Sequence, residues 1–231
     1  MINTDPKTLG LAFLGGIIPS LIWLWFWLKE EDRNTEPKGV LTIIFILGMI
    51  AVILVLQIEK FIQSQISSHE LQLISWAAAE EIMKYLAVIV IISKTNFIKK
   101  PIDWPIYMIT SAVGFAAMEN TFFLIKPISL GETTVSLITG QLRFLGSTLL
   151  HTISSGVIGI SIGLAFFMSE NKKKIHVFVG IFLAILLHSV FNFFIIKNDG
   201  NDFLKVFAFL WVATIIVMLL FEKLRRMSGE Y

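Results

Sequence analysis

The chain alternates between long apolar stretches and short polar breaks. Each stretch has about 20 residues, the length that a helix needs to cross roughly 30 Å of hydrocarbon. Backbone groups cannot stay unpaired in lipid, and strand-like segments of about ten alternating residues are not seen, so the stretches are predicted to be helices. We expect seven spans, at about residues 9–28, 39–57, 71–93, 104–125, 143–168, 175–196 and 203–222.

The breaks between these stretches are short and charged, and no internal repeat or long linker divides the chain. The sequence therefore predicts one domain, residues 1–231, with an all-α fold: an integral membrane protein built as a single bundle of about seven transmembrane helices. The first stretch follows Asp5 and lacks a small-residue cleavage site, so we expect it to be retained.

Composition supports a membrane protein. The chain has 231 residues, of which 55% are hydrophobic and 16% charged, against about 25% charged in soluble domains. Its mean hydropathy is +0.78. A net charge of +2 without a Lys/Arg stripe gives no indication of a nucleic-acid partner. The chain has no cysteine, which excludes disulfides, thiol nucleophiles and thiolate metal sites.

Lysine and arginine predict the orientation in the cell membrane. Twelve of them fall in four segments: the loops 29–38, 94–103 and 169–174, and the tail after residue 221. The other side holds six, including Arg143, and Lys84 lies inside a span. We expect the N-terminus outside and the C-terminus in the cytoplasm.

Polar residues occur inside four of the predicted spans, where each charged group costs at least about 2.5–3.5 kcal/mol. At about 1.5 Å of rise per residue, the acids and histidines lie about 9–13 Å below the outer face. Two descending and two ascending helices thus bring them to one layer in the outer half of the membrane. The residues are Glu80, Glu81, Lys84, Glu119, Asn120, His151, His188 and Asn192.

Each group also has a structural interpretation. Lys84 can form an ion pair with Glu80 or Glu81 that holds helices together, and a lone histidine can be a helix–helix contact. Gly159 and Gly163 form an ordinary small-residue packing motif. Structural roles do not explain three carboxylates and two histidines at one depth with one cation.

This set of side chains suits hydrolysis of an amide bond with water as nucleophile. A carboxylate in a partly dry pocket can act as a general base, and His188 with Asn192 can stabilise an oxyanion. Two histidines and a glutamate also match a catalytic zinc site, with Glu80, Glu119, His151 and His188 as possible ligands. Whether a divalent metal such as zinc takes part stays open. No motif supports a serine mechanism, although Ser155 lies one turn from His151.

Four motifs in chain order resemble the PrsW family of intramembrane proteases, and the segment from Pro19 to Pro37 is similar to that family as well. The match covers about residues 15–195. The family in turn resembles the type II CAAX prenyl endopeptidases. The motifs are Glu80-Glu81-x-x-Lys84, Phe115-x-x-x-Glu119-Asn120, His151-x-x-x-Ser155-Gly156 and His188-x-x-x-Asn192.

The resemblance implies a protease that cuts a membrane-anchored protein, such as a single-pass anti-sigma factor, on its extracytoplasmic side. By analogy with the prenyl endopeptidases, Glu80 is the water-activating base and Glu81 the partner of Lys84. His188 and Asn192 stabilise the oxyanion. Those enzymes have Phe-x-x-x-His where this chain has Phe115-x-x-x-Glu119, so the assisting group is Glu119 or His151.

Two other functions fit the same residues. Buried acids and histidines also build proton relays in transporters and channels, although one polar layer and the lack of an inverted repeat disfavour this function. A binding protein that keeps the pocket without turnover is the other. The peptidase is the primary hypothesis.

Overall fold

The computed structural model describes residues 5–29, 37–93, 95–197 and 203–229, and its regular structure over these residues is entirely helical. Arg33 and Lys94, which belong to the loops used to predict the orientation, lie outside the described residues, as do Asp32 and Glu36 of the segment from Pro19 to Pro37. The helices are α1 (Pro6–Lys29), α2 (Lys38–Gln65), α3 (His69–Ile92), α4 (Asp103–Ser129), α5 (Thr133–Leu142), the π-helical η1 (Arg143–Ser147), α6 (Thr148–Leu164), α7 (Glu170–Lys197) and α8 (Phe203–Met227).

Because α5, η1 and α6 follow one another without a break, they form one long helix, Thr133–Leu164. Six helices of the described chain are long and apolar enough to cross a membrane. The helix α3 is not among them, and it is the helix that carries Glu80, Glu81 and Lys84. Two predicted boundaries differ by eight residues or more: α2 extends to Gln65, and the fifth long helix begins at Thr133.

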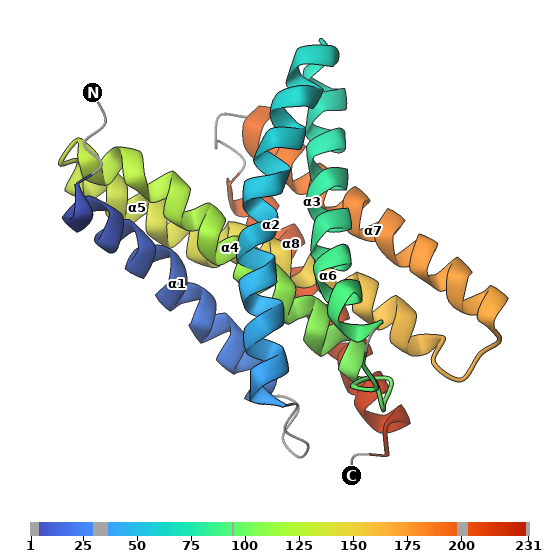
Figure 1. Ribbon diagram of the computed structural model, residues 1–231. Helices are drawn as coiled ribbons and strands as arrows, with labels where there is room; N and C mark the ends of the chain where they lie inside the picture. Colours follow the sequence, from blue (N-terminus) through green and yellow to red (C-terminus); the bar gives the residue numbers. More distant parts are fainter. Residues whose placement is uncertain (1–4, 30–36, 94, 198–202, 230–231) are drawn as a thin grey trace.

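The helix α4 lies at the centre of the molecule, in contact with α1, α2, α3, α5 and α6 (Figure 1). It is buried on all sides over much of its length, since residues 105–117 have almost no exposed surface. The helix α6 packs against α4 and carries α7 and α8 on its other sides. The large apolar residues on the outside, such as Leu14, Trp25 and Phe178, are exposed, as expected where the surrounding medium is lipid.

Glycines allow the backbones of α4 and α6 to come very close. A Cβ atom on Gly159 would lie 2.6 Å from the backbone nitrogen of Pro105 and 2.8 Å from the carbonyl oxygen of Trp104. A Cβ on Gly163 would lie 2.5 Å from the carbonyl oxygen of Pro101. The packing role predicted for this glycine pair is therefore confirmed: Gly159 packs against the first turn of α4, and Gly163 against Pro101, just before that helix.

We expect Gly159→Ala to destabilise the protein, because the methyl group would meet backbone atoms that cannot rotate away. Overpacking of this kind costs about 1–3 kcal/mol. Thermal unfolding in detergent should show a lower midpoint for Gly159→Ala. The matched control is Gly39→Ala, where a Cβ meets nothing within 4 Å. Equal midpoints for the two variants would contradict the packing role.

Candidate functional site

One turn of α3 places three ionisable side chains in the interior. Glu80 is 6% exposed, and Glu81 and Lys84 are fully buried. Adjacent residues leave a helix in different directions, although Glu80 and Glu81 both approach Lys84 and His188. Glu80 lines a cavity, whereas Glu81 contacts residues of α6 and α7.

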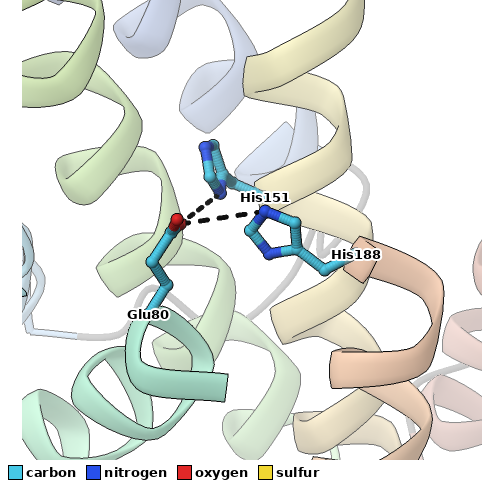
Figure 2. Close-up of side chains that lie close together, drawn as sticks. All are labelled: Glu80, His151 and His188. Atoms are coloured by element: carbon cyan, nitrogen blue, oxygen red, sulfur yellow. Dashed lines mark ion pairs between the residues drawn. The ribbon is translucent and has the colours of Figure 1, made fainter. Parts of the chain in front are cut away.

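Glu80 meets two histidines from other helices (Figure 2). Its Oε2 atom lies 3.7 Å from Nδ1 of His151 on α6 and 3.8 Å from Nε2 of His188 on α7. The two imidazole rings are 5.1 Å apart, nearly perpendicular. This Oε2 atom is buried and makes no hydrogen bond within the described chain. Such an oxygen is uncommon, since buried polar atoms normally have partners.

Glu81 holds three side chains in place. Its Oε1 atom lies 2.7 Å from Nζ of Lys84 and 2.9 Å from Nδ1 of His188, and its Oε2 accepts a hydrogen bond of 2.7 Å from Ser155. The nitrogen of His188 that faces Glu81 is therefore the protonated one, and Nε2 points towards Glu80. The hydroxyl of Ser155 is a donor to Glu81 and has no surface exposure.

Lys84 is the buried cation of the cluster. Its Nζ atom lies 2.8 Å from Nδ1 of His151 and 3.6 Å from Oε2 of Glu80. A lysine ammonium has donors only, so Nδ1 of His151 accepts and the ring proton is on Nε2. That Nε2 atom lies 3.0 Å from Oε2 of Glu119. The two expected partners of Lys84, Glu80 and Glu81, are both in contact with it.

The remaining predicted residues lie around this centre. Glu119 forms an ion pair with Arg143. Asn120 is buried, donates from Nδ2 to the hydroxyl of Thr148 over 2.9 Å and accepts from Nε of Arg143 over 2.5 Å. Asn192 follows His188 by one helical turn and lines the same cavity as Glu80. The structure thus brings all the predicted residues into one neighbourhood.

The cavity has a volume of about 590 Å³ and is bordered by α2, α3, α4, α7, α8 and the long helix Thr133–Leu164, which includes η1. Large apolar residues such as Trp76, Phe122 and Phe191 form much of its wall. An apolar cavity with a few convergent polar groups is typical of a binding or active site. The polar side chains of the wall are Glu59, Glu80, Glu119, Arg143, Ser147, His151, His188 and Asn192.

The centre of the cluster has the composition of a metal site. Within the described chain, Glu80, His151 and His188 each offer one ligand atom, and these atoms lie within 4.8 Å of one another. Two histidines and a glutamate are a ligand set of catalytic zinc, and the hydrogen bond from His188 to Glu81 is the usual outer support of a zinc-binding histidine. Glu119, also predicted as a possible ligand, is not a member of this group.

A model of the PrsW family intramembrane metalloproteases matches residues 36–221. The chain belongs to the PrsW family. Among curated proteins it is similar to Protease PrsW of Clostridioides difficile, with 29% identity over 78% of this chain and 77% of the relative. It is also similar to Protease PrsW of Oceanobacillus iheyensis, with 27% identity over 88% and 91% of the two chains. No solved structure matches the chain.

Membership of the PrsW family makes this protein a peptidase and a multi-pass membrane protein. The family is described as metalloproteases, in agreement with the ligand set in the cavity. Glu59 and Arg143 also line the cavity, although neither was predicted as a site residue. Glu59 lies beyond the predicted end of its span, and Arg143 was counted only as a charge at the start of one.

Proposed function

We propose that this PrsW-family protease hydrolyses a peptide bond of a membrane-anchored protein near the outer membrane face, with Glu80 as the group that activates water. The observation that carries the proposal is the buried Oε2 atom of Glu80, which faces two imidazoles and has no hydrogen bond within the described part of the chain. Such an atom can accept the proton of an attacking water molecule. A single-pass anti-sigma factor is the substrate that the family resemblance implies.

The other residues take supporting roles in this proposal. His188 is held by Glu81 through Nδ1, so its Nε2 atom faces the space in front of Glu80. Asn192 lies on the same face one turn later and offers an amide donor to the developing oxyanion. Glu119 orients His151, and Lys84 balances the charge of Glu81 and Glu80. Asn120 supports Arg143.

The same atoms fit a divalent metal ion. Glu80, His151 and His188 would hold it, and when bound it would supply Lewis-acid activation of water and of the substrate carbonyl. The Nδ1 atom of His188 is already bound to Glu81, so Nε2 would be its ligand atom, whereas Nδ1 of His151 would have to lose Lys84. Because Glu80 is required with or without metal, its proposed importance does not depend on the cofactor.

Metal content provides a test that does not depend on activity. We expect the purified wild-type protein to bind about one zinc ion per chain, measured by elemental mass spectrometry after dialysis. His188→Ala should bind less, because it removes a ligand, and His176→Ala, far from the cluster on α7, is the matched control. Recovery of activity when zinc is added after chelation would support the metal mechanism. Zinc-free wild-type protein with full activity would contradict it.

The function itself is tested by a survey of new protein N-termini in membranes of cells that express either the wild type or Glu80→Gln. We expect a cut in the outward-facing segment of a membrane-anchored protein with the wild type alone, which would also identify the substrate. Identical profiles from two folded and equally abundant proteins would contradict the proposal. Uptake or current through the wild type in liposomes would then become the next test, since buried acids also serve proton transport.

A further inference from the structure

The long helix Thr133–Leu164 contains a π-helical turn at the active-site cavity. Residues Arg143–Ser147 form this turn, and the backbone N–H of Thr148 donates to the carbonyl of Arg143, five residues back. Residues eight apart on a regular α-helix drift by about 80° around the axis. The wider π turn offsets this drift, and Arg143, Ser147 and His151 all reach the same carboxylate, that of Glu119.

Trp23 of α1 binds the backbone of the π turn. The indole N–H of Trp23 donates to the carbonyl oxygen of Phe144 over 2.9 Å, and the two rings are 5.7 Å apart. Trp23 is 9% exposed, whereas its neighbour Trp25 is 61% exposed. A backbone carbonyl in an irregular turn within lipid needs such a donor. The π turn is thus held by a specific side chain, and π turns of this kind are frequent at functional sites.

The guanidinium group of Arg143 is held by several contacts. Its Nε donates to Oδ1 of Asn120 over 2.5 Å, and its Nη2 donates to Glu119 and, over 3.0 Å, to the hydroxyl of Ser147. It also lies 3.8 Å from the centre of the Phe123 ring. A planar guanidinium with fixed N–H directions can orient a carboxylate in a way that a lysine ammonium cannot.

Glu119 connects Arg143 to His151, because its carboxylate contacts both side chains. Its Oε2 atom accepts from Arg143, from Ser147 over 3.3 Å and from the Nε2 proton of His151 over 3.0 Å. The side chain of Arg143 is 15% exposed and that of Glu119 22% exposed, so the pair is only partly screened by water. The plane of the His151 ring, and with it the Nδ1 atom that faces Glu80, is fixed by this contact.

We propose that Arg143 is a positioning residue of the peptidase: it holds Glu119 in the orientation that aligns His151 with Glu80. It acts through Glu119 and does not touch the reacting atoms. This inference rests on the proposed function, because it takes Glu80 and His151 as parts of the active centre. Arg143 stands in none of the four sequence motifs, and its role depends on the π turn.

The test compares kcat and KM of purified wild type, Arg143→Gln and Arg143→Lys on the substrate identified by the N-terminal survey. Loss of a contact that orients an active-site side chain typically costs about 10–100-fold in activity. We expect this loss in kcat for Arg143→Gln, with KM little changed, and a smaller loss for Arg143→Lys. The matched control is Lys126→Gln. This variant removes an exposed charge from the C-terminal part of α4, where Glu119 also lies, and leaves the contact between Arg143 and Glu119 in place.

A double-mutant comparison separates positioning from an independent role. If Arg143 acts through Glu119, the double variant Arg143→Gln/Glu119→Gln should have the same kcat as Glu119→Gln alone. Additive losses would overturn the proposal, and so would a wild-type kcat in Arg143→Gln. Should Arg143→Gln fail to fold, Arg143→Lys decides: a wild-type kcat contradicts the proposal.

The proposed roles of Glu80 and Arg143 can be disproved separately. If Glu80→Gln cleaves normally, the proposed function is wrong whatever Arg143 does. If Glu80→Gln is inactive while both Arg143 variants retain full kcat, the assignment of Glu80 stands and only the positioning role of Arg143 is wrong.

Discussion

Glu80→Gln is expected to abolish detectable proteolysis while the protein stays folded. Glutamine has almost the same shape as glutamate but can neither take up a proton at this position nor serve as an anionic metal ligand. Removal of a general base costs about 10²–10⁴-fold in rate. The Oε2 atom of Glu80 makes no hydrogen bond within the described chain, and Lys84, 3.6 Å away, keeps the nearer carboxylate of Glu81 at 2.7 Å, so the folded state should be little affected. Turnover of purified protein and its thermal midpoint measure the two effects separately.

The matched control for this variant is Glu170→Gln. The side chain of Glu170 is 79% exposed and pairs with Lys173, so its replacement should change neither turnover nor stability. Cleavage by Glu80→Gln at the rate of Glu170→Gln would remove Glu80 from the mechanism. Loss of both folding and activity in Glu80→Gln would instead assign Glu80 a structural role.

Glu81→Leu is expected to produce the largest loss of stability among single substitutions at the site. The substitution leaves the ammonium of Lys84 buried without its closest carboxylate, 2.7 Å away. It also removes the acceptor of His188 and Ser155. Removing one partner of a buried ion pair costs about 3–5 kcal/mol. Denaturant unfolding in mild detergent should show the loss directly.

The double variant Glu81→Leu/Lys84→Met should recover part of that stability, because an apolar pair of similar size can replace a buried ion pair. It should not recover activity, since His188 remains unsupported. Glu170→Leu is the exposed counterpart and should cost far less stability, because exposed ion pairs contribute little. Equal losses from Glu81→Leu and Glu170→Leu would contradict the buried ion pair.

Much of the helical fold could be predicted, because membrane spans follow from apolar length alone. The convergence of Glu80, His151 and His188 could also be predicted, since each lies at a similar distance from a span end. The helix α3 was expected as a span from its apolar residues, although its three central charges set it apart from the six helices that are long and apolar enough to cross a membrane. The orientation in the membrane remains a prediction.

Local irregularity could not be predicted. The contact of Arg143 with Glu119 depends on the π turn, and no feature of the segment Arg-Phe-Leu-Gly-Ser indicates a wider turn. The eight-residue extension of α2 that brings Glu59 to the cavity is too polar to count as part of a span. The role of Ser155 stayed open because a histidine one turn away is compatible with a nucleophile, whereas in the structure its hydroxyl donates to Glu81.

The most direct test of the central claim uses the substrate that the N-terminal survey identifies. Purified wild type and Glu80→Gln are each reconstituted into liposomes with that substrate, and the cleaved bond is located by mass spectrometry. We expect one cut by the wild type, at a bond in or next to the outer half of the membrane, and none by Glu80→Gln. A cut in the cytoplasmic part of the substrate, or the same cut by Glu80→Gln, would contradict it.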